Sequence, residues 1–214
     1  MYTASVSVRL HQLKESSLIR QTTIRQQEIV NSARRIIISA GMERLTVREI
    51  AADLKITDGA LYRHFKSKKE ILNLLIDDIE KTLLATINEA AQKSDDPLQK
   101  LEDIFLSHLS YVEQRKGVSF IVINKTLSLK DKSLQRRMFG VVNKYLKTIK
   151  SILKEGIARR EIRSDIDIES SSIVFFGMVQ SIVTVWGLSG YKYSLRKERL
   201  DQMFKLYKRG IVVR

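Results

Sequence analysis

The chain has 214 residues, which is long enough to bury a sizeable core in one domain or in two small ones. Its 38 Lys and Arg residues outnumber its 24 Asp and Glu residues, and a net charge of +14 favours a polyanionic partner. The chain contains no cysteine, which excludes disulfides, thiol redox sensing and cysteine-ligated zinc.

No N-terminal segment has the apolar core of a signal peptide. The longest apolar run, Ile173 to Leu188, is interrupted by Gly177, Gln180 and Ser181 and is expected to be too short to span a bilayer. We therefore expect a cytoplasmic protein with no membrane partner. An all-α fold is expected, because Pro97 is the single proline and few stretches alternate as strands do.

Residues 1–20 precede the first clear helical pattern and form an N-terminal extension with scattered basic and apolar residues. They are either a basic arm that reaches along DNA or a frayed tail with a little helix. The first helix is predicted from about Ile24 to Ala40 and is ended by Gly41. Its inward side chains are expected to be Ile29, Ala33, Ile36 and Ile37.

Residues 46–70 carry the most information. Thr46 with Glu49, and Ser67 with Glu70, both fit the S/T-x-x-E capping box that marks a helix N-terminus. Between them lie two short apolar stripes, which predict two short helices joined by a tight turn, followed by a further helix start. Such short helices must pack against neighbours, as they do in a helix-turn-helix.

This segment resembles the DNA-binding part of the TetR/AcrR family of bacterial transcriptional repressors over roughly residues 22–75. The resemblance implies an N-terminal three-helix DNA-binding domain (residues 21–67) and a C-terminal helical domain for effector binding and dimerisation (residues 68–214). The matching residues are Ile29, Ala33, Gly41, Thr46, Ile50, Ala51, Thr57, Gly59, Leu61, Tyr62, His64, Phe65, Lys68 and Glu70.

The resemblance places the second short helix, Thr57 to His64, in the major groove of a double-stranded DNA operator. It assigns Thr46, Tyr62, His64 and Lys68 to phosphates, and Gly59 leaves room for the backbone to approach the groove. Arg48 is a candidate for a bidentate contact to guanine, and Arg63 for a base or the backbone. Tyr62 could instead be a packing residue, and His64 a histidine satisfied within its turn.

Two residues depart from the family pattern. Lys55 stands where the family usually has a glycine, and a left-handed backbone there would cost roughly 1 kcal/mol or more. Asp58 is acidic beside the groove. It could accept a hydrogen bond from cytosine N4, the reading we favour, or merely oppose the phosphates and sharpen selectivity.

Further helices are predicted along the rest of the chain. Asp96 followed by Pro97 is an N-cap with proline at the first helical position. The inward side of the helix from Ser133 is expected to carry Phe139, Val142, Leu146, Ile149, Ile152 and Leu153. The expected helices run from after Ser67 to about Ala91, from Pro97 to about Glu113, within Val118 to Leu129, from about Ser133 to Arg160, from near Asp167 to Gly187 or Gly190, and roughly from Arg196 to Arg209.

The helix that begins near Asp167 is apolar on nearly every side and is expected to be buried all round. The family resemblance implies that this helix and the last one pack against their copies in a two-fold homodimer. The alternative is a purely internal core. The last helix is also strongly basic, and a solvated face is the reading we favour.

The helices between Pro97 and Leu188 would enclose a pocket for a small effector, expected to be apolar, with an acyl chain or an aromatic ring. Gln180 and Thr184 are its polar candidates, since a buried amide or hydroxyl needs a partner that a ligand can supply. No cofactor or metal is expected, because His108 has no supporting ligand at a suitable spacing. The other candidate lining residues are Phe105, His108, Phe120, Ile123, Asn124, Phe139 and Phe176.

These features predict a ligand-responsive homodimeric repressor that binds a near-palindromic operator. One alternative is a DNA-binding protein of the same fold without an inducer, with an architectural or division-linked role. An enzyme is not expected, because the sequence has no P-loop, no G-x-S-x-G, no H-E-x-x-H and no cysteine nucleophile.

Overall fold

The computed structural model describes residues 24–62, 65, 67–195 and 199–213. The predicted all-α fold is confirmed, and the expected helices are present with ends within a few residues of the predicted ones. The N-terminal extension (residues 1–20), Arg63 and His64 lie outside the described residues. The elements are α2 (Ile24–Ala40), the 3-10 turn η1 (Met42–Arg44), α3 (Val47–Asp53), α4 (Asp58–Tyr62), α5 (Lys68–Ala91), α6 (Pro97–Gln114), α7 (Val118–Ser128), α8 (Lys132–Ala158), α9 (Ile168–Leu188) and α10 (Arg199–Ile211).

The N-terminal head consists of α2, η1, α3 and α4 and has a small apolar core. Ile29 and Ala33 of α2 are buried with Ile50 of α3 and Leu61 of α4. Gly41 ends α2 with a φ of 83°, a positive value that glycine adopts without steric cost. Helices as short as α3 and α4 are unstable alone, so this shared core is what holds them in place.

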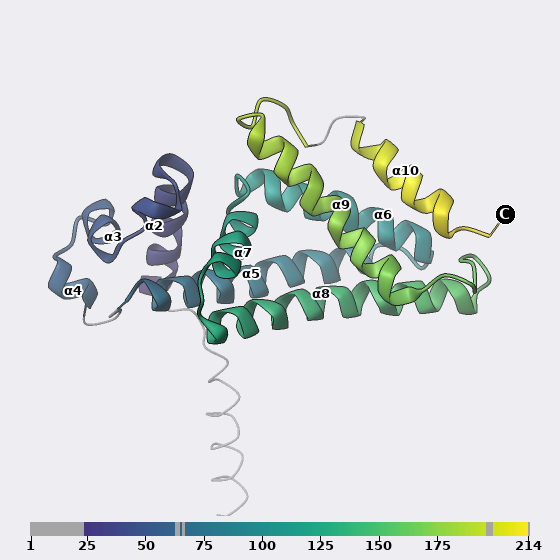
Figure 1. The fold of residues 1–214 in the computed structure, drawn as a ribbon, viewed down its shortest axis with the longest axis horizontal. Helices are drawn as coiled ribbons and strands as arrows, with labels where there is room; N and C mark the ends of the chain where they lie inside the picture. Colours follow the sequence, from purple (N-terminus) through teal and green to yellow (C-terminus); the bar gives the residue numbers. More distant parts are fainter. Residues whose placement is uncertain (1–23, 63–64, 66, 196–198, 214) are drawn as a thin grey trace, which may run out of the picture.

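Helix α5 belongs to two parts of the molecule at once (Figure 1). It packs against α2 of the head and against α6, α7 and α8 of the helical body, the name used here for α6 to α10. Its inward residues, among them Leu72, Ile76 and Ile79, are buried. The head is therefore attached to the body by a continuous helix.

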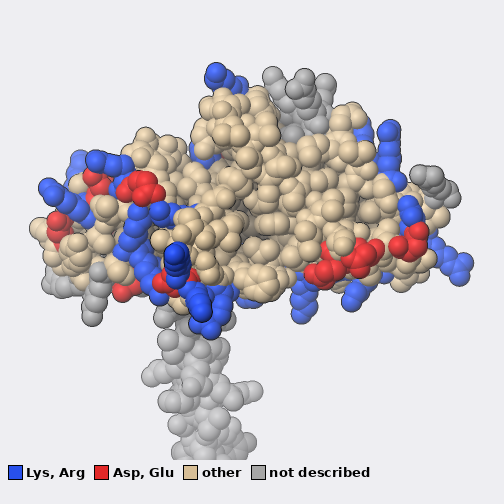
Figure 2. Space-filling model, viewed as in Figure 1, with Lys and Arg blue, Asp and Glu red and all other residues tan. Residues whose placement is uncertain are grey.

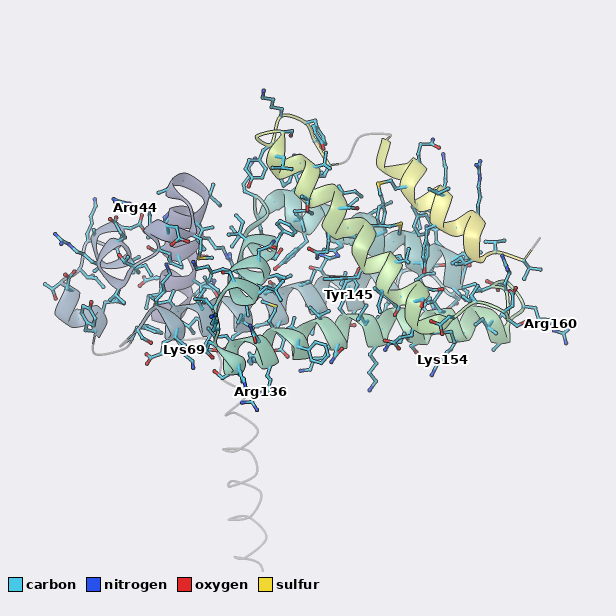
Figure 3. All side chains as sticks on the ribbon, viewed as in Figure 1. Arg44, Lys69, Arg136, Tyr145, Lys154 and Arg160 are labelled. Carbon is cyan, nitrogen blue, oxygen red and sulfur yellow. The ribbon has the colours of Figure 1, made fainter. Side chains whose placement is uncertain are left out.

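In the helical body, α8 and α6 both pack against α5, α9 crosses α8 and contacts α6, and α10 lies at the outer edge (Figure 1). Phe105 of α6 lies between Phe175 of α9 and Phe204 of α10, with ring centroids 6.2 and 5.7 Å apart. Tyr145 of α8 points into the body, whereas Lys154 on the same helix points out to solvent (Figure 3). Aromatic side chains thus hold the body together.

The end of α10 is tied back to the end of α8. Ile162 forms an isolated antiparallel bridge with Val212, and the Arg163 amide donates to the Ile211 carbonyl at 2.8 Å. Gly156 leaves the space in which the Ile162 side chain lies, because a Cβ at Gly156 would be 2.5 Å from Ile162 Cδ1. The loop after α8 therefore packs directly on the helix backbone.

The prediction that Phe139 lies on the inward face of its helix was wrong. Its side chain is 64% exposed, whereas Met138 and Val141 beside it are buried. Successive residues differ by about 100° around an α-helix, so the buried row through Met138, Val141 and Tyr145 turns Phe139 outward. Val142, also predicted inward, is only half-buried.

Within the single chain α9 is buried on one side only, and its outer side is the one expected from the family resemblance to meet a second copy. Ile173, Val174 and Val185 are exposed, and Leu188 is 85% exposed. At 21 residues α9 is longer than the apolar run expected from the sequence, and by length and composition it could cross a membrane. Core helices of soluble proteins pass the same test, and the other side of α9 packs on α6 and α8.

Candidate DNA-binding surface and effector region

Both short helices of the head begin at a threonine that caps them. Thr46 Oγ1 accepts a hydrogen bond from the Glu49 amide at 3.1 Å, and Thr57 Oγ1 accepts from the Ala60 amide at 3.2 Å. This confirms one half of the capping box predicted at Thr46. The Glu49 carboxylate forms an ion pair with Arg44 at 2.9 Å. Because each threonine hydroxyl acts as an acceptor, its proton stays available to a phosphate oxygen.

The turn between α3 and α4 contains the expected departure from the family pattern. Lys55 has a φ of 55°, a left-handed conformation that a glycine would adopt more easily. The amides of Lys55 and Ile56 donate to the carbonyls of Ala52 and Ala51 at 3.1 and 3.0 Å. These bonds end α3 and direct the chain into α4.

The described DNA-binding candidates of α3, α4 and their caps are all exposed. Arg48 on α3 and Asp58 and Gly59 on α4 stand clear of the core together with Thr46 and Thr57. Tyr62 is 49% exposed, although it follows the buried Leu61. A Cβ at Gly59 would meet no atom within 4 Å, so the surface of α4 is open at this position.

Lys68 differs from these residues because its ammonium group is engaged inside the head. It is half-buried, and its Nζ donates to the carbonyl of Met42 at 2.9 Å. Burial lowers the pKa of Lys68, and nearby Glu43 partly offsets this effect. An ammonium group has three N–H donors, and the bond to Met42 uses one of them. The predicted phosphate contact of Lys68 would use another and stays a prediction.

Ser67 occupies the N-cap position of α5, as predicted, but its side chain makes no capping hydrogen bond. Other ion pairs on the head, which the sequence did not indicate, join Arg35 to Asp53 at 2.5 Å and Glu43 to Lys125 of α7 at 2.7 Å. The bond from Lys125 holds the pKa of Glu43 below its usual range. The Glu43–Lys125 pair links the head to the body.

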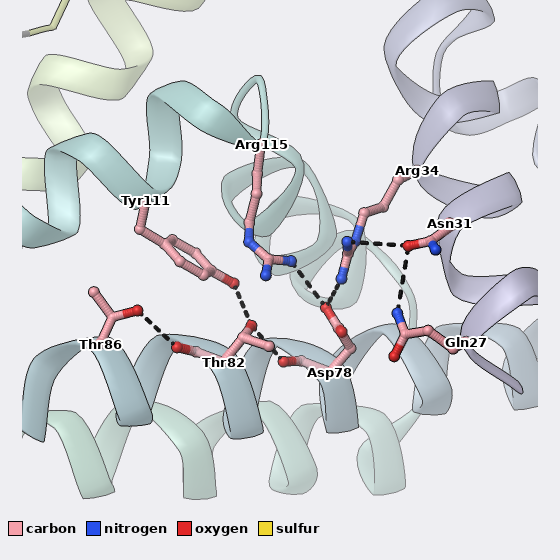
Figure 4. Close-up of polar contacts among 8 residues, drawn as sticks. All are labelled: Gln27, Asn31, Arg34, Asp78, Thr82, Thr86, Tyr111 and Arg115. Atoms are coloured by element: carbon pink, nitrogen blue, oxygen red, sulfur yellow. Dashed lines mark hydrogen bonds and ion pairs between the residues drawn. The ribbon is translucent and has the colours of Figure 1, made fainter. Parts of the chain in front are cut away.

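A second link between head and body is much less exposed, and its contacts are drawn in Figure 4. The carboxylate of Asp78 on α5 pairs with Arg34 of α2 and with Arg115 at the end of α6. Burial raises the pKa of Tyr111, whose ring lies under the Arg115 guanidinium at 4.5 Å from the ring centroid. These partners are far apart in sequence, and no local spacing pointed to them.

The predicted pocket residues fall into three groups by exposure. Phe105 and His108 are buried in α6. The exposed candidates are Asn124, Phe139 and Thr184. Asn124 Nδ2 donates to the Phe120 carbonyl at 2.9 Å, and Thr184 Oγ1 donates to the Gln180 carbonyl at 2.8 Å, so their own helices satisfy these groups. The half-buried candidates are Phe120, Ile123, Phe176 and Gln180.

The structure brings His108 and Phe176 together through Tyr145, a residue that the sequence did not single out. Its ring centroid lies 5.2 Å from that of His108 and 5.4 Å from that of Phe176. His108 Nδ1 lies within hydrogen-bond distance of the Tyr145 hydroxyl, at 3.2 Å. Burial lowers the pKa of His108 to about 3, so the imidazole is neutral at pH 7.

Two family models match the chain. The model of bacterial regulatory proteins of the tetR family matches residues 29–75, and the model of the YsiA-like protein C-terminal region matches residues 70–210. The first covers most of the head, and the second covers nearly all of α5 and the body.

Curated relatives match over most of their length. The nucleoid occlusion factor SlmA of Idiomarina loihiensis is 29% identical over 143 residues, which are 67% of this chain and 73% of the relative. The fatty acid metabolism regulator protein of Bacillus subtilis is 25% identical over 177 residues, which are 83% of this chain and 91% of the relative.

Solved structures share the fold. FadR from Bacillus subtilis, in complex with stearoyl-CoA, gives a TM-score of 0.76 at 23% identity and covers 86% of this chain and 98% of that chain. The ketosteroid regulator KstR2 of Mycobacterium tuberculosis gives 0.70 at 21% identity and covers 91% and 98%. Since the two family models together span the head and the body, the chain belongs to the TetR family of bacterial regulatory proteins.

Proposed function

We propose that this protein is a homodimeric transcriptional repressor that leaves a near-palindromic operator when a small apolar effector binds. In this proposal residues 21–67 bind DNA, and residues 68–214 bind the effector and form the dimer. The observation that carries the proposal is the exposed surface of α3 and α4, on which Arg48, Asp58 and Tyr62 stand beside two capping threonines.

On DNA, α4 would enter the major groove with its N-terminal residues towards the base edges. Thr46, Thr57 and Tyr62 would donate to phosphates and so fix the register of the head, and Arg48 would bind guanine through both guanidinium branches. Asp58 would accept from cytosine N4. Arg63, His64 and Lys68 complete the proposed contact set.

The dimer would form through α9 and α10. The exposed residues Val174, Val185 and Leu188 of α9 and Leu206 of α10 are apolar side chains without cover in the single chain. Figure 2 shows a broad area without charged side chains over this side of the molecule. Exposed apolar side chains in an area without charges are typical of an interface, and a two-fold contact would cover them with a second copy.

The effector site would lie between α6, α7, α8 and α9, lined by Phe105, His108, Phe120, Ile123 and Phe176. This part of the body is rich in aromatic side chains, and His108 and Tyr145 add a polar pair. An effector with an acyl chain fits such an environment. The similarity to a fatty acid metabolism regulator and to a structure that holds stearoyl-CoA supports this choice. The other predicted lining residues would contact the effector only if they turn inward on binding; they are Asn124, Gln180, Thr184 and Phe139.

Repression would end because the effector prefers the form that does not bind DNA. A hundredfold loss of operator affinity requires that the effector bind this form about 2.8 kcal/mol more tightly. This magnitude is within reach of a ligand that buries an acyl chain, since each buried methylene contributes about 0.8 kcal/mol.

The test begins with purified protein and sheared DNA from its source, with bound fragments sequenced at near-physiological salt. A few fragments that share an inverted repeat are expected, and stearoyl-CoA is expected to release them. Stearate serves as a control for the acyl chain of the ligand, and free CoA serves as a control for its nucleotide part. Equal recovery of all fragments would contradict sequence reading by Arg48 and α4.

A second function is favoured by the similarity to nucleoid occlusion factors. In that case the protein would bind many chromosomal sites with no small-molecule inducer. The same experiment separates the two functions, because many scattered sites that acyl-CoA does not release would support this second one.

A further inference from the structure

Asp78 lies where three helices meet, and a single oxygen of its carboxylate accepts from two arginines (Figure 4). Arg34 Nη2 reaches Asp78 Oδ2 from α2, and Arg115 Nη1 reaches the same oxygen from the end of α6 at 3.2 Å. The side chains of Arg34, Asp78 and Arg115 are only 19, 10 and 22% exposed. The charges are therefore poorly screened by water.

Neighbouring groups contact the backbone of Asp78 and the two arginines. The Thr82 hydroxyl donates to the Asp78 backbone carbonyl at 2.7 Å, which uses its only proton. The Tyr111 hydroxyl, 3.1 Å from Thr82 Oγ1, must then be the donor in that contact. Tyr111 also supports the Arg115 guanidinium with its ring. On the other side, Arg34 Nη1 donates to Asn31 of α2 at 3.4 Å.

Asp78 supplies the negative charge that Arg34 and Arg115 share. Two guanidinium groups that share one oxygen repel each other, and the carboxylate between them offsets that repulsion. The Glu43–Lys125 pair is the other ion pair between head and body among the described residues, but Glu43 is 83% exposed. Exposed pairs contribute little because water and salt screen them.

We propose that Asp78 is a positioning residue for DNA recognition: through Arg34 it fixes the angle at which the body presents α3 and α4. Through Arg115 it also connects that angle to the corner between α6 and α7, where Gly117 adopts a left-handed conformation with a φ of 71°. Displacement of this corner moves Arg115 and so alters the hold on Arg34. This second part rests on the proposed function, because the effector would supply the displacement.

The chain offers a matched control one residue away. Asp77 also lies on α5, but it pairs with Arg137 of α8 at 2.5 Å and so joins two helices without contact to the head. Asp78→Asn and Asp77→Asn each remove one carboxylate charge from adjacent positions of one helix. Asp77 is 36% exposed and Arg137 also pairs with Glu80 at 2.7 Å, so Asp77→Asn controls for the loss of a charge on α5 without loss of the link to the head.

The first experiment measures the position of the head directly and needs neither operator nor effector. Since the chain has no cysteine, Ala52→Cys on α3 and Lys147→Cys on α8 give unique, exposed sites for spin labels. Labelled chains are diluted with unlabelled chains, and the distance within one chain is measured by double electron–electron resonance. A narrow distribution is expected for the parent and for Asp77→Asn, and a broadened or shifted one for Asp78→Asn.

An unchanged distribution in Asp78→Asn would overturn the proposal. If that variant does not fold, Arg34→Met breaks only the head side and leaves Asp78 paired with Arg115. It is expected to broaden the distribution in the same way, and an unchanged distribution in Arg34→Met would equally overturn the proposal. This readout stays decisive even if the protein proves to have no inducer.

The second experiment measures operator affinity with and without stearoyl-CoA. Without effector, Asp78→Asn is expected to bind the operator roughly tenfold or more weakly than the parent. The ratio of its operator affinities without and with stearoyl-CoA is expected to fall towards one. Asp77→Asn should retain the parent ratio. A normal ratio in Asp78→Asn would refute the link through Arg115. A parent protein that does not respond to acyl-CoA would instead refute the proposed effector.

Discussion

The imidazole of His108 lies 3.2 Å from the hydroxyl oxygen of Tyr145, and both side chains are buried between α6 and α8. Burial lowers the pKa of His108 to about 3 and raises the pKa of Tyr145. Both groups are thus held in their neutral forms. The body therefore contains a hydrogen-bonding pair without a charge.

This pair predicts how stability depends on pH. In the unfolded chain His108 takes up a proton below about pH 6.5, whereas the folded protein resists protonation down to about pH 3. The contribution of His108 to the free energy of unfolding is therefore fully present above its pKa in the unfolded chain. It is lost, by about 1.4 kcal/mol per pH unit, as the pH falls towards its pKa in the folded protein. Thermal unfolding of the parent and of His108→Gln at about pH 7.5 and 5.5 measures the difference. Equal pH slopes in the two proteins would contradict the prediction.

Gly156 and Gly140 provide a second prediction on one helix. Gly156→Ala is expected to destabilise the fold by about 1–3 kcal/mol, because the new methyl group would collide with Ile162 Cδ1 and Cγ1, 2.5 and 2.7 Å away. Gly140→Ala meets no atom within 4 Å and is expected to stabilise α8 by about 0.5–1 kcal/mol. Urea unfolding of both variants tests the pair. A loss of stability at both positions would show that helix propensity and contact geometry fail to account for α8.

The two predicted capping boxes should behave differently. Thr46→Ala removes an acceptor that the Glu49 amide uses and is expected to cost about 1 kcal/mol. Ser67 has no capping hydrogen bond from its side chain, so Ser67→Ala should change the free energy of unfolding by much less. Chemical unfolding of the single variants measures both values. Equal costs would mean that the serine hydroxyl caps α5 after all.

Asp58 yields a prediction about specificity. It is the first residue of α4 and is exposed beside Thr57. Asp58→Ala is expected to alter the preferred base at one operator position more than it alters affinity, because a lost contact to cytosine N4 removes discrimination there. Selection from a randomised operator pool shows the change. Uniformly tighter binding to every sequence would assign Asp58 the electrostatic role instead.

Local signals made the helices predictable from sequence. The N-caps at Thr46 and Asp96 and the stop at Gly41 are short-range features, and the structure places each where the pattern predicts. Phe139 was misplaced because Met138, one residue earlier and about 100° away around the helix, lies on the inward row instead. Apolar composition alone does not distinguish a core from an interface, and only the family resemblance assigned the outer side of α9 to a dimer contact.

The polar links escaped prediction for a different reason. Arg34 and Asp78 are 44 residues apart, and Arg115 is 37 residues beyond Asp78. Only the packing of α2 and α6 on α5 brings them together, and no sequence spacing encodes that packing. The same holds for Tyr145, whose partner His108 is 37 residues away.

The double membership of α5 limits how the protein can be recombined with others of its family. A chimera that keeps this head but takes another body from Lys68 onward would leave Arg34 in its half-buried position without the carboxylate of Asp78. A buried cation that loses its partner is strongly destabilising. The workable junction therefore lies beyond Asp78, inside α5, and the head must be transplanted with the first turns of a helix that belongs to the other half.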